Sequence, residues 1–189
     1  MRRVIEDAIL ESIRVKEGLI KANIGDILKI ANEIISSIKK GGKLIIFGNG
    51  GSASDAQHIA AELVGRFKKD RPALPAIALT VNTSIITALA NDFGYEAVFA
   101  RQVEALAKKP DIVLGISTSG KAKNVSLGLK EAKKMGLYTI ALTGCDGGEV
   151  KGDADISLIV PSYDTPRIQE SHILIGHIIC QLVEDSGVC

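Results

Sequence analysis

Two short segments of the chain place glycines and hydroxyl side chains directly after an apolar run. Asn49–Ser52 follows the run at 43–47, and Ser117–Gly120 follows the run at 111–116. A helical pattern begins after each segment, so backbone N–H groups and hydroxyls would meet at a helix start, where phosphate binds well. For the first segment alone, an ordinary turn capped by Ser52 is an equally good interpretation. Three consecutive hydroxyls in the second segment exceed what one cap needs, so together the segments predict a phosphorylated ligand.

A candidate acid–base or metal-binding pair lies in the helical pattern after the first segment. His58 and Glu62 are four residues apart, so they share one face of the predicted helix. Such a pair can bind a metal ion or supply an acid and a base. On spacing alone, a hydrogen bond on a helix surface is the simpler alternative. Because the pair lies one to two turns inside a helix that starts at the phosphate segment, Glu62 is a candidate base.

The last helical pattern, near 166–185, holds further polar candidates among apolar residues. His172 and His177 would each be most simply explained as buried core histidines. Gln169 and His177 are eight residues apart, about 12 Å along a straight helix. They reach one ligand only if their side chains converge, the helix bends, or they come from different subunits. The segment 91–94, Asn-Asp-Phe-Gly, most simply forms an Asx turn with a glycine stop.

The elements that position these residues follow from hydrophobic periodicity. Two amphipathic helical patterns fill residues 1–40, and short apolar runs then alternate with helical patterns. This alternation predicts an α/β fold, a doubly wound five-stranded parallel sheet of the flavodoxin-like kind, with helices on both faces and two N-terminal helices. The five runs lie near 43–47, 76–80, 111–116, 138–142 and 155–160.

The expected strand order brings the two polar segments together. In the common order 2-1-3-4-5, strands one and three are neighbours, and the chain changes direction between them. Because each polar segment follows one of these strands, both would face one ligand. The 189 residues are most simply a single domain, 1–189, made of a helical pair (1–40), a parallel α/β core (43–160) and a C-terminal helix (166–185).

Composition argues against several classes of protein. The net charge is +1, the lysines are scattered as pairs, and aromatic residues make up 4% with no Trp, so a nucleic-acid-binding surface is not expected. No uncharged apolar run reaches ~18 residues, so no membrane span is expected, and the acidic residues near the start do not fit a signal peptide. Cys145, Cys180 and Cys189 are odd in number and lack CxxC spacing, which favours reduced thiols in a cytoplasmic protein.

Longer motifs add up to a resemblance that covers essentially the whole chain. They lie at 48–63, 90–92, 116–120, 141–144 and 167–177, with the sequences GNGGSASDAQHIAAEL, AND, ISTSG, ALTG and RIQESHILIGH. These motifs resemble those of the phosphoheptose isomerases, a branch of the sugar isomerase (SIS) domain family, and they are far more specific than a single glycine loop.

The resemblance implies a cytoplasmic homotetramer that converts D-sedoheptulose 7-phosphate into D-glycero-D-manno-heptose 7-phosphate through an enediol. That reaction is the first step towards ADP-heptose for lipopolysaccharide and other cell-surface polysaccharide. The resemblance further implies Glu62 as the base, His177 as the acid, and one zinc ion per subunit. The zinc ligands would be His58, Glu62, Gln169 and His177, and the phosphate ligands Ser52, Ser117, Thr118 and Ser119. The other residues implied to bind substrate are Asn49, Gly50, Gly51, Glu62, Asn91, Asp92 and Gln169.

One position departs from the family pattern, and two alternative functions stay open. Ala122 stands where the family often has a serine, so one phosphate hydrogen bond is lost, with Lys121 as the compensating charge. The main alternative is a non-enzymatic SIS protein, because one relative binds the bacterial replication initiator without isomerase chemistry. Such a protein needs neither Glu62 nor His177, and both are present. The other alternative is an isomerase of a different sugar phosphate.

Overall fold

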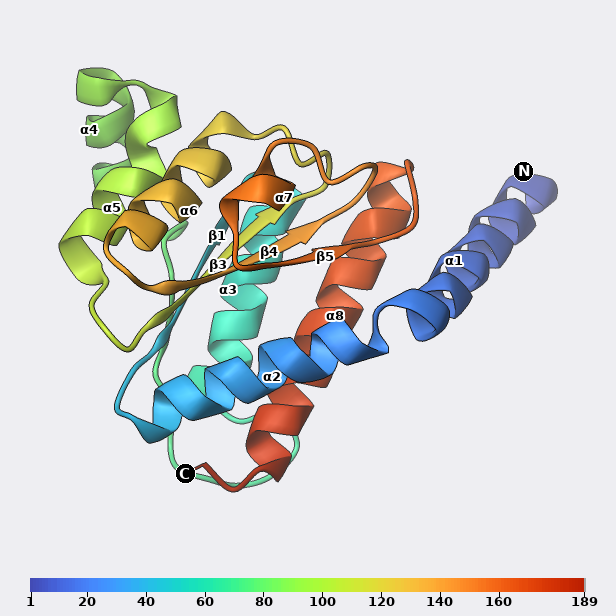
Figure 1. The fold of residues 1–189 in the computed structure, drawn as a ribbon. Coiled ribbons are helices and arrows are strands. Elements are labelled where there is room, and N and C mark those ends of the chain that lie inside the picture. Colours follow the sequence, from blue (N-terminus) through green and yellow to red (C-terminus); the bar gives the residue numbers. More distant parts are fainter. Residues whose placement is uncertain (189) are drawn as a thin grey trace.

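The computed structural model describes residues 1–188, in which five parallel strands form one sheet (Figure 1). The strand order is β2-β1-β3-β4-β5, so β1 and β3 are neighbours, paired from Leu44 with Ile112 to Gly48 with Ile116. The predicted doubly wound order is confirmed. The strands are β1 (Leu44–Gly48), β2 (Ala76–Ala78), β3 (Ile112–Ser117), β4 (Tyr138–Thr143) and β5 (Ile156–Ile159).

Helices precede the sheet and fill its connections, as the periodicity predicts. The N-terminal pair is α1 and α2, and the C-terminal helix is α8 (Figure 1). The helices are α1 (Arg2–Ala22), α2 (Ile24–Lys39), α3 (Gly51–Val64), α4 (Thr83–Phe93), α5 (Val98–Leu106), α6 (Lys123–Lys134), α7 (Val150–Asp153) and α8 (Thr165–Asp185), with a short 3₁₀ turn η1 (Tyr95–Ala97).

The strand residues alternate between two apolar layers, because successive side chains of a strand point to opposite faces of the sheet. Ile46 and Leu114 pack in the layer with α2, α3 and α8, whereas Phe47 and Val113 pack in the layer with α5 and α6. Every residue of β1 and β3 is buried. Coverage of both faces is what produces near-continuous apolar strands in a parallel sheet.

Helix α1 extends away from the sheet (Figure 1), and its apolar stripe is exposed. Val4, Ile9 and Ile13 are 71%, 56% and 48% exposed, whereas Val15 and Leu19 near the other end of the helix are buried. An exposed apolar stripe of this length is typical of a surface that another chain covers.

Two further expectations concern membranes and cysteines. Within residues 1–188, no helix is long and apolar enough to cross a membrane. Cys145 and Cys180 are free thiols, as predicted. Burial raises the pKa of Cys180 to about 12, which makes this thiol unreactive. Cys189 lies outside the described residues.

Candidate active site

The two polar loops line one pocket at the carboxyl ends of β1 and β3. The pocket has a volume of about 170 Å³, and Gln169 in the first turns of α8 also contributes to it. We refer to it as the loop pocket. Its lining residues are Asn49, Ser52, Ile116, Ser117, Thr118, Ser119, Ala122 and Gln169. This switch point of a doubly wound sheet is where such folds bind ligands.

Two helix starts meet at the loop pocket. Helix α3 begins after Gly50, which has a φ of +55° that favours glycine, and α6 begins after Ala122. Both residues occupy the N-cap position, and neither has a side-chain oxygen that could accept a hydrogen bond from the first turn of its helix. The first N–H groups of α6 and the Gly51 N–H can therefore donate to a bound anion, assisted by the helix dipoles, whereas the Ser52 and Ala53 N–H groups already donate to the Asn49 and Gly50 carbonyls.

The predicted hydroxyl residues lie at different depths in the loop pocket. Ser52 and Ser117 are 3% and 5% exposed, Thr118 is half-buried, and Ser119 is exposed. The Ser119 hydroxyl accepts a hydrogen bond from the Lys121 N–H at 3.2 Å. The four hydroxyls and two helix starts thus lie together on one side of the sheet crossover, an arrangement whose chemistry suits an anion.

The Asn49 side chain is engaged within the protein itself. Its amide donates to Asn124 Oδ1 at 2.8 Å, and its carbonyl accepts from Asn124 Nδ2 at 2.9 Å and from the Tyr95 hydroxyl at 3.1 Å. The prediction of a sugar contact therefore applies chiefly to the Asn49 backbone, because the hydrogen bonds of the side chain hold the loop in place. Asn124 and Tyr95 were not identified from the sequence, because their pairing with Asn49 depends on contacts across the sheet.

A second cluster lies further along α3, where the sequence predicts the acid–base pair. His58 Nε2 lies 3.0 Å from Glu62 Oε1 and 3.1 Å from His177 Nε2 of α8. Glu62 and His177 are half-buried and His58 is exposed. We refer to these three residues as the His–Glu cluster. The expectation of a buried core histidine is thus wrong for His177, which faces α3 and not the core.

The geometry of the His–Glu cluster fits a metal ion. One N–H on His58 Nε2 cannot serve both Glu62 and His177 with full strength, whereas a cation between the three atoms would satisfy all of them. The ligand atoms lie within 4.8 Å of one another, and donor atoms around a tetrahedral zinc ion are about 3.3 Å apart. Two histidines and one glutamate form a common set of ligands at catalytic zinc sites.

Within one chain, Gln169 does not lie with His58, Glu62 and His177. Its amide lies against Gly51, at the start of α3, and in the loop pocket. Asn91 and Asp92 lie at the end of α4 and are exposed, with the Asn91 amide donating to Asp92 Oδ1 at 2.8 Å. Helix α4 packs on the α5 side of the sheet, away from α8 (Figure 1). Sugar contacts by Asn91 and Asp92 stay predictions.

Asp55 is an acidic residue that lies between the loop pocket and the His–Glu cluster, and the sequence alone did not identify it. It lies three residues after Ser52 and three before His58, so it neighbours each of them on the surface of α3. Burial raises the pKa of Asp55 to about 6, although the nearby His58 opposes this. Asp55 Oδ2 is buried and has no hydrogen-bond partner among residues 1–188. The three-residue spacing of Ser52, Asp55 and His58 is the sequence feature that could have identified it.

His172 is the buried core histidine that the sequence predicts. It is fully buried, and its Nε2 lies 3.0 Å from the Thr143 carbonyl oxygen. Burial lowers the pKa of His172 to about 4, so the ring is neutral and Nε2–H donates to that carbonyl. His172 therefore holds α8 against β4 and takes no part in the His–Glu cluster.

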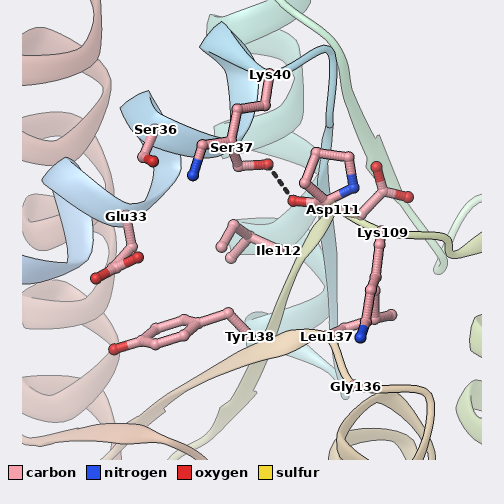
Figure 2. Close-up of a pocket in the computed structure, with 11 residues that line it drawn as sticks. Glu33, Ser36, Ser37, Lys40, Lys109, Asp111, Ile112, Gly136, Leu137 and Tyr138 are labelled. Atoms are coloured by element: carbon pink, nitrogen blue, oxygen red, sulfur yellow. Dashed lines mark hydrogen bonds between the residues drawn. The ribbon is translucent and has the colours of Figure 1, made fainter.

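A separate pocket of about 290 Å³ lies at the opposite end of the sheet (Figure 2). Its residues come from the end of α2 and from the amino ends of β3 and β4, and the Ser37 hydroxyl donates to the Pro110 carbonyl across it at 2.7 Å. Although it is larger than the loop pocket, it lies away from the carboxyl ends of the strands. Lys40 and Lys109 beside Glu33 give it no clear preference for one charge.

Comparison with known proteins gives the same assignment as the motifs. Residues 9–144 match the SIS domain family. The phosphoheptose isomerase of Clostridium acetobutylicum is 53% identical over 186 residues, which cover 97% of this chain and 95% of that protein.

Solved structures agree over almost the full length. The phosphoheptose isomerase from Francisella tularensis has a TM-score of 0.94 at 38% identity, covering 97% of both chains. The one from Neisseria gonorrhoeae has a TM-score of 0.92 at 40% identity, covering 97% of this chain and 98% of that one. The chain therefore belongs to the SIS domain family and, within it, to the phosphoheptose isomerases.

Proposed function

We propose that this chain isomerises D-sedoheptulose 7-phosphate to D-glycero-D-manno-heptose 7-phosphate through an enediol intermediate. The observation that carries the proposal is the His–Glu cluster. In this cluster His58 contacts both the Glu62 carboxylate and the His177 ring, so a candidate base and a candidate acid lie close together on the two helices that also border the loop pocket. A protein that only bound partners through this fold would need neither group. The high identity to phosphoheptose isomerases supports the same activity.

In this proposal, the loop pocket binds the phosphate end of the substrate. The hydroxyls of Ser52, Ser117, Thr118 and Ser119, the Gly51 N–H and the first N–H groups of α6 donate to the phosphate oxygens. Gln169 contacts the sugar from α8. Binding energy from the phosphate then serves to orient the reacting carbons.

The spacing of the two sites suits a long sugar phosphate. His58 lies six residues after Ser52 on α3, about 9 Å along the helix. A substrate held by its phosphate in the loop pocket must span this offset to reach the His–Glu cluster. This offset favours an extended sugar with several carbons between the phosphate and the carbonyl.

Glu62 and His177 carry the proton transfers. The Glu62 carboxylate removes a proton from C1, while His177 protonates the carbonyl oxygen at C2, which gives a cis-enediol. His177, now without its proton, then removes the hydroxyl proton from the oxygen on C1, and Glu62 delivers its proton to C2, which gives the aldose. His58 contacts both residues and so keeps their side chains in position relative to each other.

We further propose that the His–Glu cluster binds a zinc ion, with His58, Glu62 and His177 as its ligands. When bound, zinc would polarise the substrate carbonyl and favour the enediol. A metal-bound carboxylate is a weaker base, so Glu62 would carry both roles only at some cost to its basicity. Zinc bound at His177 Nε2 would likewise replace the proton on that atom, so the proton that His177 donates would then come from Nδ1. Gln169 is better assigned to substrate than to metal, because it lies at the loop pocket and an amide oxygen is a weak zinc ligand.

We also propose a cytoplasmic homotetramer that supplies heptose for ADP-heptose and cell-surface polysaccharide. The exposed stripe of α1 supports self-association, as does an apolar groove of about 350 Å³ between α1, α2 and α8, lined by Leu19, Ile24 and Leu174 among others. Light scattering of the purified protein measures this directly, and a monomeric mass would exclude the tetramer.

Turnover of D-sedoheptulose 7-phosphate by the purified protein tests the main proposal. Aldose phosphate should form with zinc supplied, and in D₂O the product should carry deuterium at C2, because the transferred proton exchanges on the base. Absence of turnover in the folded, zinc-supplied protein would contradict the proposal. Binding of the sugar phosphate without turnover would then point to a non-enzymatic SIS protein.

A further inference from the structure

The loop that follows α3 places an aromatic ring on His177. The Phe67 ring stacks on the imidazole with centroids 5.5 Å apart and an angle of 28° between the planes. The His58 ring meets the same imidazole edge-on, at 5.0 Å and 61°. Contacts with two rings restrict rotation of the His177 side chain about its own bonds.

A buried carboxylate holds the backbone of this loop in place. Glu184 Oε1 accepts from the Phe67 N–H at 3.1 Å, and Oε2 accepts from the N–H groups of Lys68 and Lys69 at 2.8 Å and 3.0 Å. The Arg71 Nε donates to Glu184 Oε1 at 3.1 Å. We refer to Glu184, Arg71 and these three N–H groups as the Glu184 clasp.

Arg71 connects the Glu184 clasp to the end of α3. Its Nη2 donates to the Glu62 carbonyl and its Nη1 to the Leu63 carbonyl, both at 2.9 Å. The side chains of Arg71 and Glu184 are 5% and 1% exposed, and a buried ion pair is stable only where its hydrogen bonds are satisfied. The clasp thus ties the turn of α3 that holds Glu62 to the turn of α8 about 10 Å beyond His177.

We propose that Phe67 is a positioning residue for His177, and that the Glu184 clasp keeps Phe67 in place. The proposal depends on the proposed role of His177 as proton donor. An imidazole free to rotate would take its proton-donating nitrogen out of reach of the substrate oxygen, and a misplacement of about 1 Å can cost a hundred-fold in rate. The flat face of Phe67 prevents this rotation, which a flexible aliphatic side chain of similar size would not.

Three variants separate positioning from simple packing. Phe67→Leu keeps apolar volume but removes the flat ring, Phe67→Tyr keeps the ring, and Phe99→Leu makes the same chemical change in the other apolar layer, where Phe99 stacks on Phe47. We expect Phe67→Leu to lower kcat about ten- to a hundred-fold with KM within about two-fold, and Phe67→Tyr to retain most of kcat. Phe99→Leu should lower the melting temperature at least as much as Phe67→Leu, yet leave kcat nearly unchanged.

The results that would overturn the inference are specific. A kcat of Phe67→Leu close to that of the wild type, a change confined to KM, or equal losses in Phe67→Leu and Phe99→Leu would each contradict positioning. NMR of the histidine side chains provides a readout that does not depend on turnover, because the NOE between the His58 and His177 rings, whose centroids lie 5.0 Å apart, reports the orientation of the His177 imidazole. If the wild type shows no turnover, the proposed function fails. A His58–His177 NOE that is lost in Phe67→Leu but kept in Phe99→Leu still supports the inference, and one kept in both contradicts it.

Discussion

Replacement of Glu62 by Gln is the most direct test of the chemistry. Glutamine has nearly the same shape, and its side-chain oxygen can still lie 3.0 Å from His58 Nε2 as the carboxylate does. The variant removes the negative charge and the capacity to accept a proton from carbon. It therefore tests Glu62 as a base without removing its hydrogen bond to His58.

The expected loss follows from the role of a general base. Positioned acid–base catalysis contributes about a hundred- to ten-thousand-fold in rate, which corresponds to roughly 3–5 kcal/mol of transition-state free energy at about 1.4 kcal/mol per tenfold. The proposed phosphate ligands lie in the loop pocket, at the other end of α3, and are untouched. The loss should therefore appear in kcat, with KM changed by no more than a few-fold.

Two measurements on the Glu62→Gln variant distinguish its possible roles. The first is kcat and KM at saturating zinc, and the second is exchange of substrate hydrogen with D₂O, which reports proton removal alone. Glu33→Gln is the matched control, since Glu33 is a half-buried carboxylate at the opposite end of the sheet, and it should behave as the wild type.

A kcat of Glu62→Gln within ten-fold of the wild type would remove Glu62 from the role of base. If hydrogen exchange continued at its normal rate while product formation stopped, another group would have to remove the proton. Recovery of kcat on addition of excess zinc would show that the main role of Glu62 is metal binding. Only a loss of both turnover and exchange that zinc does not restore agrees with the mechanism.

Three further variants test the pocket and the core. Ser119→Ala should raise KM about three- to ten-fold with kcat unchanged, because one hydrogen bond to phosphate is lost, and an unchanged KM would place the phosphate elsewhere. Ala122→Ser should raise the free energy of unfolding by about 1 kcal/mol in urea titrations, since Ala122 has the extended backbone of an N-cap (φ −73°, ψ 107°); no gain would mean that the new hydroxyl does not cap α6. For His172, burial lowers the pKa to about 4, so the unfolded chain binds the proton first, and stability falls as the pH drops from about 6.5 to 4. His172→Gln should flatten that fall by up to about 3 kcal/mol, and an unaltered pH profile would contradict the assignment.

The sequence predicts the fold well because the fold depends on local patterns. Apolar runs of strand length alternate with helical periodicity, and each predicted run matches its strand within two residues at either end. A sheet order of β2-β1-β3-β4-β5 then follows from the usual connectivity of such units. The meeting of the two loops at one pocket is a consequence of that order, so it could be predicted too.

The parts of the site that escaped prediction depend on contacts between distant residues. Phe67 and Glu184 are 117 residues apart in the chain, and neither belongs to a motif that would mark it as functional. His177 lies in an apolar run that is typical of a core helix. It reaches α3 because Gly176 lets Ile59 approach, so closely that a Cβ at Gly176 would lie 2.7 Å from Ile59 Cδ1.

The arrangement of α3 and α8 explains how one fold separates binding from chemistry. The two helices run side by side in the same direction, with Gln169 against Gly51 at their starts, His177 against His58 in the middle, and the Glu184 clasp at their ends. The sheet determines where both helices begin, at the loop pocket, and the rise of the helices determines how far the His–Glu cluster lies from it. In the proposed mechanism, selection of substrate length therefore depends on this offset. A shorter sugar phosphate would fill the loop pocket and leave Glu62 and His177 without a carbon to act on, even though every residue of the catalytic machinery was in place.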